Sequence, residues 1–479
     1  MAATPKKTTV RRKSGKKSGK ARANAKKKPK APDELIHQWN TAGRQHMRQL
    51  NAALEALKKR WRPESPVADR GTLEKWLKKW PTEPRKLEAA EAIMTLAETA
   101  DREGRWRPDY PIADRVYEPG WVFADRMFDV QQGLKYVTIL GPDEFLVRLG
   151  SSFAPHRPRP VLHLRGGEVR ELPGVLAVAA SRSHDLLLFV REDGFSVSRG
   201  LDEAPVRHFP WPDGMSPAAF DSLQLSNDGL TIAFVLNREA VWLGQAADAA
   251  PVWTRVHPSD ALLAEIAEEE YTKDRFLHCA LSPDGRFIAC GSQFYGHVID
   301  RIEGVAAVRR WAKIGHRSKY PCYAWFSDDG ARAALSSCDF NGRGYNGASL
   351  GVRLSEIENI STEPYAENKH TTLIDDEPVY AAAWLPLGPQ KDGFVLAGED
   401  YLNIVSSDGT LRSSTHFGYP ASSIDYCPKT GIVALGSHSG FLHVFDPNRQ
   451  AETDQAIGYR PIREVYRWVL WKNRAPFRW

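Results

Sequence analysis

The sequence predicts a mainly β fold, a seven-bladed β-propeller with six or eight blades as alternatives, preceded by a small α-helical segment and a disordered basic N-terminal tail. A turn of the form Ser-x-Asp-Gly recurs along the chain, with short apolar strands before and after it. Units of three or four strands follow one another every 40 to 60 residues or so, roughly the spacing of propeller blades. Stacking such sheets radially covers faces that one sheet alone would expose. The expected blade starts lie near positions 120, 172, 220, 275, 320, 377 and 420.

The recurring turn has a chemical explanation. Its copies read Leu-Ser-Asn-Asp-Gly at 225–229, Leu-Ser-Pro-Asp-Gly at 281–285 and Phe-Ser-Asp-Asp-Gly at 326–330. The serine accepts backbone hydrogen bonds, and the glycine takes the positive φ that reverses the chain. Looser copies stand at 181–185 and 426–431. Each turn therefore joins the first two strands of a blade.

With these turns and strands, the chain resembles the WD-repeat superfamily of β-propellers over about residues 115 to 450. It departs from the family at the end of the third strand. Val-Ile-Asp at 298–300 and Val-Phe-Asp at 444–446 stand where the Trp-Asp dipeptide would be. The family's hydrogen-bond network of Asp, His, Ser or Thr, and Trp is therefore not carried over to this chain.

Residues 1–32 form a basic tail. The tail has 13 Lys or Arg residues and no acid, which leaves 52 basic and 59 acidic residues in the rest of the chain. It has too few apolar residues to offset the entropy of ordering, so we expect disorder. Such arms bind nucleic acid non-specifically through counterion release, although a solubilising extension or contact with an acidic membrane surface is an alternative. The candidate nucleic-acid-binding residues are Lys6, Lys7, Arg11, Arg12, Lys13, Lys16, Lys17, Lys20, Arg22, Lys26, Lys27, Lys28 and Lys30.

Residues 33–105 are predicted to form a helical segment between the tail and the body. Apolar side chains recur every three or four residues from Ile36 to Trp61, which places them on one face of a helix. Further helices are expected at 71–80 and 83–104. The pattern is too short for a convincing dimeric coiled coil, so packing as a small bundle or against the following domain is favoured.

The propeller body is predicted over residues 115–455, with two insertions. Residues 257–274 have the pattern of a helix that begins at a serine cap. The glycine-rich stretch 338–351 lengthens the loop between the second and third strands of one blade. Binding residues often lie on loops of a rigid scaffold, although a tolerated insertion is the alternative. The candidate partner-binding residues in this loop are Phe340, Arg343 and Tyr345.

The C-terminal segment, residues 456–479, is rich in aromatic side chains. It is too apolar for a loose tail. We therefore expect it to pack on the body or to close the ring, with a role as a partner-binding motif as the alternative.

No linear motif assembles an active site, so we predict a non-enzyme with no catalytic residue, no metal and no cofactor. The five cysteines include no Cys-x-x-Cys pair, and we expect buried thiols rather than a disulfide framework. The alternative is a hydrolase-like propeller enzyme with its site in the central channel. Its candidate residues would be Asp185, His278, Asp300 and His443.

These features together predict a monomeric, non-catalytic protein-interaction scaffold with an unidentified protein partner. The tail would add non-specific affinity for DNA or RNA. A bacterial defence or toxin-neutralising binding protein is a further alternative. No apolar run reaches the 18 or so residues that span a bilayer, and the first residues do not resemble a secretory signal. We therefore expect a cytoplasmic protein, with the nucleoid or nucleus as options because of the tail.

Overall fold

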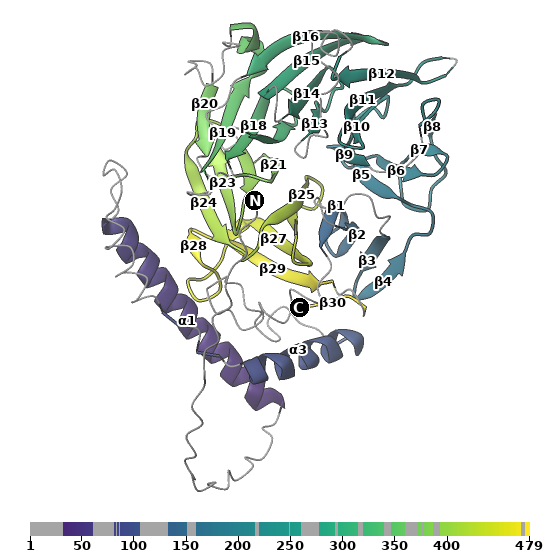
Figure 1. Ribbon diagram of the computed structural model, residues 1–479. Helices are drawn as coiled ribbons and strands as arrows, with labels where there is room; N and C mark the ends of the chain where they lie inside the picture. Colours follow the sequence, from purple (N-terminus) through teal and green to yellow (C-terminus); the bar gives the residue numbers. More distant parts are fainter. Residues whose placement is uncertain are drawn as a thin grey trace, which may run out of the picture.

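The computed structural model describes residues 32–60, 81–82, 84–85, 87–105, 133–150, 160–215, 220–248, 250–259, 277–292, 296–314, 320–339, 346–359, 371–375, 378–386, 393–470 and 475–479. Two helices, α1 (Pro32–Arg60) and α3 (Leu87–Arg102), precede a ring of β-sheets (Figure 1). They match the apolar patterns of the sequence, whereas the helices expected at 71–80 and within 257–274 fall on residues that are not described. Neither α1 nor α3 is long and apolar enough to cross a membrane.

The first four blades are antiparallel sheets of four strands. Blade 1 contains β1 (Leu134–Gly141), β2 (Glu144–Leu149), β3 (Val161–Arg165) and β4 (Glu168–Glu171). Blade 2 contains β5 (Ala177–Ala180), β6 (Leu187–Arg191), β7 (Gly194–Ser198) and β8 (Arg207–Pro210). Blade 3 contains β9 (Phe220–Leu225), β10 (Thr231–Leu236), β11 (Ala240–Gln245) and β12 (Val252–His257). Blade 4 contains β13 (His278–Leu281), β14 (Phe287–Ser292), β15 (Gly296–Gly304) and β16 (Ala307–Ile314).

The remaining blades carry additions at their outer edges. Blade 5 contains β17 (Tyr320–Phe326), β18 (Arg332–Asp339), β19 (Asn346–Arg353) and β20 (Thr371–Asp375), with the 3₁₀ helix η1 (Leu354–Asn359) after β19. Blade 6 contains β21 (Ala381–Leu385), β22 (Gly393–Ala397), β23 (Tyr401–Ser406), β24 (Leu411–His416) and β28 (Gly458–Tyr459). Blade 7 contains β25 (Ala421–Cys427), β26 (Ile432–Ser437), β27 (Phe441–Gln450), β29 (Ile462–Val469) and β30 (Phe477–Arg478).

The first strands of the blades form the inner circle of the ring. Contacts run from β1 through β5, β9, β13, β17, β21 and β25, and then back to β1 (Figure 1). The predicted seven-bladed β-propeller is therefore confirmed. The first described strand of blade 1 begins at Leu134 and its last ends at Glu171, and the start expected near position 120 falls on residues that are not described.

The blades adhere because neighbouring sheets cover each other's faces. Successive side chains of a strand point to opposite faces of its sheet. On β10, Ile232 and Phe234 pack against blade 2, whereas Ala233 and Val235 pack against blade 4. One cluster of buried apolar side chains lies at each of the seven junctions between blades. Burial between blades is thus the main source of stability for the ring.

The Ser-x-Asp-Gly turns have the chemistry that the sequence predicts. Ser226 Oγ accepts a hydrogen bond from the Thr231 backbone N–H at 3.0 Å and donates to Asp228 Oδ1 at 2.6 Å. Gly229 has a φ of 68°. The turns at 282–285 and 327–330 repeat these contacts. The turns therefore hold the first two strands of each of these blades in register.

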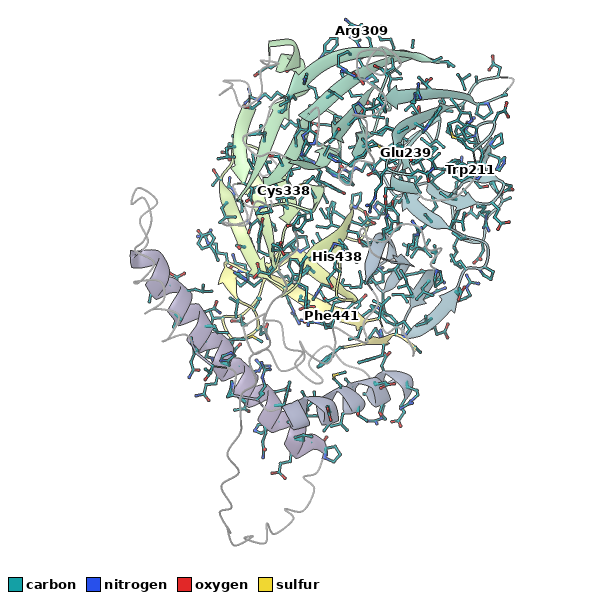
Figure 2. The ribbon with its side chains drawn as sticks, viewed as in Figure 1. Trp211, Glu239, Arg309, Cys338, His438 and Phe441 are labelled. Atoms are coloured by element: carbon teal, nitrogen blue, oxygen red, sulfur yellow. A yellow bond between two sulfur atoms is a disulfide. The ribbon has the colours of Figure 1, made fainter. Side chains whose placement is uncertain are left out.

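The two helices pack against the outer side of blade 7. Met47 and Leu50 of α1 bury Ile457, which lies between β27 and β29. Trp39 of α1 belongs to a second buried cluster that also contains Phe441 and Trp479. Figure 2 shows Phe441 on the side of the ring that faces the helices. The helical segment thus covers strand edges that would otherwise be exposed.

Candidate functional site

The residues that the sequence singled out for binding fall outside the described part of the chain. The 13 basic residues of the tail all precede Pro32, the first described residue. Phe340, Arg343 and Tyr345 lie between the end of β18 at Asp339 and the start of β19 at Asn346. Their proposed roles therefore stay predictions.

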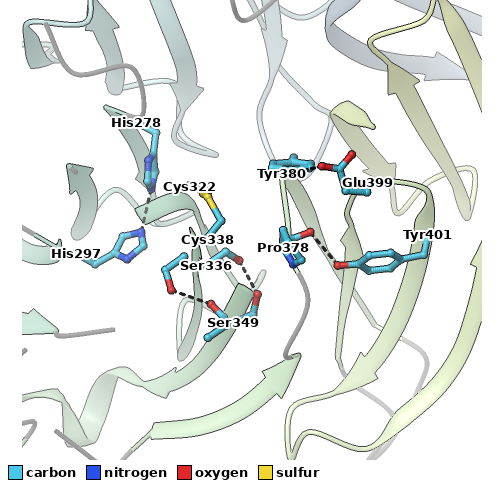
Figure 3. Close-up of a disulfide and its surroundings, with 12 residues drawn as sticks. His278, His297, Cys322, Ser336, Cys338, Ser349, Pro378, Tyr380, Glu399 and Tyr401 are labelled. Carbon is cyan, nitrogen blue, oxygen red and sulfur yellow. Dashed lines mark hydrogen bonds between the residues drawn. A yellow bond between two sulfur atoms is a disulfide. The ribbon is translucent and has the colours of Figure 1, made fainter. Parts of the chain in front are cut away.

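A disulfide lies at the base of the loop that contains Phe340. Cys322 of β17 and Cys338 of β18 are bonded, with 6.4 Å between their Cα atoms (Figure 3). The expectation of five buried thiols is wrong for these two residues, whereas Cys279, Cys290 and Cys427 are free and buried. The spacing of the cysteines in the sequence did not indicate this bond, because it depends on a shift in the register of the strand pairing between Pro321 and Tyr323.

The acids and histidines proposed for a channel enzyme do not gather in one place. Buried His278 shares a hydrogen bond of 3.0 Å with His297 (Figure 3). His443 contacts Glu464 through Nδ1 at 2.9 Å, and Glu464 also accepts two hydrogen bonds from Arg467.

The two proposed aspartates are likewise engaged in separate ion pairs. Asp300 is paired with Arg310, and burial raises the pKa of Asp300 against the opposing effect of that arginine. Asp185 lies at the surface and pairs with Lys429 at 2.7 Å. Among the described residues, no cluster of His, Cys, Asp or Glu has the arrangement of a metal site.

The central channel is bridged by Arg182, which lies in the turn between β5 and β6. Its Nη2 donates a hydrogen bond to the backbone oxygen of Phe326 at 3.2 Å, and its guanidinium lies 3.2 Å from the ring centroid of Trp325. Blades 2 and 5 are not neighbours, so this contact crosses the channel. Burial lowers the pKa of Arg182 to about 10, although Asp328 and Asp425 act in the opposite direction.

A second bridge joins Lys135 of β1 to Asp221 of β9. Lys135 is only 6% exposed. Burial lowers its pKa to about 6, and the positive charges of Arg148 and Arg238 lower it further. Blades 1 and 3 are joined here past blade 2, so this pair also connects blades that do not adjoin. Arg182 and Lys135 therefore serve contacts between blades.

An open cleft lies where blades 2 and 3 meet, on the side of the ring that carries the Ser-x-Asp-Gly turns. Its volume is about 540 Å³, within the range of about 300 to 1,000 Å³ that is common for ligand pockets. The sequence reasoning missed it because two blades contribute its walls. Its lining residues are Asp185, Leu186, Val197, Arg199, Val206, Arg207, Asn227, Asp228 and Gly229.

Comparisons with known proteins add little to these observations. No protein-family model matches the chain, and no curated protein matches it. Among solved structures, it is similar to the crystal structure of the WD40 β-propeller domain of Doa1. The TM-score is 0.42, with 13% sequence identity over 66% of this chain and 94% of that domain. The fold assignment rests instead on the closed circle of seven sheets, which makes the chain a seven-bladed β-propeller.

Proposed function

We propose that the protein is a non-catalytic protein-interaction scaffold. The observation that carries this proposal is the contrast between the channel and the cleft. Arg182 and Lys135 are engaged in contacts that hold the blades together, whereas the cleft between blades 2 and 3 is open and lined by turns and strands of two packed blades. A preformed concave surface on a rigid framework is a common setting for binding.

The test of the scaffold proposal is capture of a protein partner by the purified full-length chain. We expect saturable binding of one defined partner that persists when both proteins are purified. A triple variant, Phe340→Ala, Arg343→Ala and Tyr345→Ala, examines the predicted contact loop in the same assay. Failure to isolate any partner that binds the purified chain would contradict the scaffold proposal. Unchanged binding by the triple variant would show that Phe340, Arg343 and Tyr345 do not contact the partner.

We further propose that the basic tail gives the scaffold non-specific affinity for DNA or RNA. Its 13 cations within 32 residues support this role, because each phosphate they neutralise releases a condensed counterion. If six to ten of them contact phosphates, the affinity should fall about 10³ to 10⁵-fold between about 50 and 200 mM salt.

A truncated chain that lacks residues 1–32 provides the control for the tail. We expect it to lose nucleic-acid binding in a fluorescence-anisotropy titration with a labelled duplex. Equal binding by the truncated and full-length proteins would show that the tail is not the nucleic-acid contact.

We also propose that the protein is a monomer and that it is cytoplasmic. Light scattering would test the oligomeric state, and localisation of a tagged chain would test the compartment.

A further inference from the structure

The cleft between blades 2 and 3 has an apolar floor. Leu186 and Val197 belong to the apolar cluster that joins the two blades. Gly229 packs closely on this floor, because a Cβ atom at its position would lie only 2.8 Å from Leu186 Cδ1 and 3.3 Å from Val197 Cγ1. The floor is therefore a continuous surface built by both blades, and it is already in place without a partner.

Exposed apolar side chains lie at the edge of this floor. Val206 is 54% exposed and lines the cleft. Leu230 is 40% exposed and directly follows Gly229. Apolar side chains exposed together beside a concave surface can mark a binding site. Covering Val206 and Leu230 would require an apolar group on the partner.

The charges at the cleft favour a negatively charged partner. Asp185 is paired with Lys429, and Asp228 accepts hydrogen bonds from Ser226 Oγ and from the Leu230 backbone N–H. Arg199 and Arg207 make no ion pair or side-chain hydrogen bond with any other described residue. Because the two aspartates are engaged within the protein, the two guanidinium groups are the charges left for a ligand, and guanidinium matches carboxylate in geometry.

These observations lead to one occupant. We propose that the cleft binds a short acidic segment of a partner protein, in which an aliphatic side chain lies between carboxylates. The aliphatic side chain covers Val206 and the apolar floor, and the carboxylates meet Arg199 and Arg207. A nucleic-acid strand fits less well, since it offers no aliphatic side chain to cover Val206 and the apolar floor. The proposal rests on the scaffold function and specifies the chemistry of its partner.

Two synthetic peptides test the proposal in fluorescence-anisotropy titrations. The probe is Gly-Glu-Asp-Leu-Glu-Asp-Gly, and its control has glycine in place of leucine with the same charge. The full-length chain is used in about 150 mM salt, which largely screens long-range attraction to exposed charges. The glycine peptide reports what charge alone contributes, from the basic tail and from Arg199 and Arg207 together. We expect the leucine peptide to bind about tenfold or more tightly, because it alone can bury an apolar side chain on the floor.

Substitutions test whether the cleft causes the difference in affinity between the two peptides. Arg199→Glu combined with Arg207→Glu should weaken binding of the leucine peptide at least about tenfold. The matched control is Arg286→Glu combined with Arg309→Glu, which makes the same change in net charge within blade 4. Arg309 lies on the side of the ring opposite the helices (Figure 2). Val206→Ser should reduce the difference between the two peptides and leave binding of the glycine peptide unchanged.

Two results would overturn the proposal. One is equal binding of the leucine and glycine peptides by the wild-type chain. The other is an equal effect of the cleft pair and the blade 4 pair of substitutions. Neither result contradicts the scaffold proposal, which is tested separately by capture of a partner. A captured partner that binds the wild type and the Arg199→Glu, Arg207→Glu variant equally well would show that the scaffold uses another surface.

Discussion

The junction between blades 7 and 1 and the junction between blades 2 and 3 are built differently. Blades 2 and 3 follow each other in the sequence, whereas blades 7 and 1 are the last and first blades and meet only by closing the ring. We call the junction of blades 7 and 1 the closing seam. Its apolar cluster includes Trp468, which has no exposed surface, and Phe145 from the facing blade.

Polar contacts reinforce the closing seam. Arg478 of β30 donates hydrogen bonds to Asp101 of α3 at 3.0 Å and to Asp143 of blade 1 at 2.7 Å. The Tyr466 hydroxyl donates to the backbone oxygen of Pro142 at 2.8 Å. Asp425 accepts a hydrogen bond from the Ile139 backbone N–H at 2.8 Å. The seam is thus held by directional bonds in addition to apolar burial.

The junction of blades 2 and 3 has an aromatic core but leaves one end open. Phe195 lies 4.4 Å from Trp211 and 4.9 Å from Phe234, measured between ring centroids. At the turn side of the ring, the same junction opens into the cleft that contains Arg199 and Arg207. Chain continuity holds blades 2 and 3 together, and the side chains of Arg199 and Arg207 at this junction are available for binding. At the seam, Arg478 is used instead to join β30 to α3 and blade 1.

Among the substitutions considered, one at the closing seam should cause the largest loss in the free energy of unfolding. Trp468→Ala should lower the free energy of unfolding by about 3 to 5 kcal/mol, because it removes a fully buried aromatic ring and leaves a cavity. Urea denaturation followed by circular dichroism measures the change. Trp211→Ala at the junction of blades 2 and 3 is the comparison, and it should cost less because Trp211 is only partly buried. Equal losses for the two variants would contradict the difference between the junctions.

The next largest loss of stability is expected at Arg478, whose hydrogen bonds join β30 to α3 and to blade 1. Arg478→Met should cost about 3 kcal/mol, because Asp101, with a side chain only 3% exposed, loses its charged partner. Arg478→Lys keeps the charge but loses the fork geometry, so it should recover only part of the loss. Hydrogen exchange of the β1 amides should accelerate in the methionine variant. Unchanged exchange in β1 would show that Arg478 anchors α3 without securing blade 1.

The sequence could predict the ring but not its seam. Recurrent Ser-x-Asp-Gly turns between apolar strands predict blades, because turn chemistry and strand alternation are local properties of the chain. The contacts of Arg478 depend on residues more than 300 positions away in the sequence, and no local pattern indicates them. The aromatic composition of 456–479 suggested packing on the body or ring closure, and β29 and β30 of that segment do pair within blade 7.

The same limit applies to the candidate site. The walls of the cleft come from four places, namely the turns after β5 and β9 and the strands β7 and β8 with the residues next to them. No spacing rule along the sequence predicts that Arg199 and Asp228 line the same cleft, because they lie in different blades that only the fold brings together. The Cys322–Cys338 disulfide was missed for a similar reason, since a register shift within one strand pair decides which residues are neighbours.

The pH dependence of the seam provides a third prediction. His184 bonds the backbone oxygens of Ile139 in blade 1 and Tyr426 in blade 7, and it lies 3.3 Å from Asp425. Burial alone would lower its pKa, but the negative charge and hydrogen bond of Asp425 raise it to about 11.

An unfolded histidine has a pKa of about 6.5, so the stabilisation is complete below that pH and is lost as the pH rises toward 11. His184 alone should therefore lower the free energy of unfolding as the pH rises over this window, by at most about 1.4 kcal/mol per unit. Lys135, whose pKa burial lowers to about 6, contributes a rise of similar size over much of the same range, so the two contributions oppose each other. His184→Asn, which tolerates the positive φ at this position, should remove the falling contribution. The free energy of unfolding of this variant should therefore rise more steeply with pH than that of the wild type in urea titrations at about pH 7, 8 and 9. An unchanged slope would show that another group governs it.

The smallest effect is expected at the cleft. Arg207→Ala should change the free energy of unfolding by no more than about 0.5 kcal/mol, because its guanidinium makes no ion pair or side-chain hydrogen bond with another described residue and its loss opens no buried cavity. Urea denaturation of this variant beside Arg478→Met makes the comparison direct, since both changes remove one guanidinium at a blade junction. A loss above about 1 kcal/mol for Arg207→Ala would mean that this arginine stabilises the ring, and the junction of blades 2 and 3 would then resemble the seam.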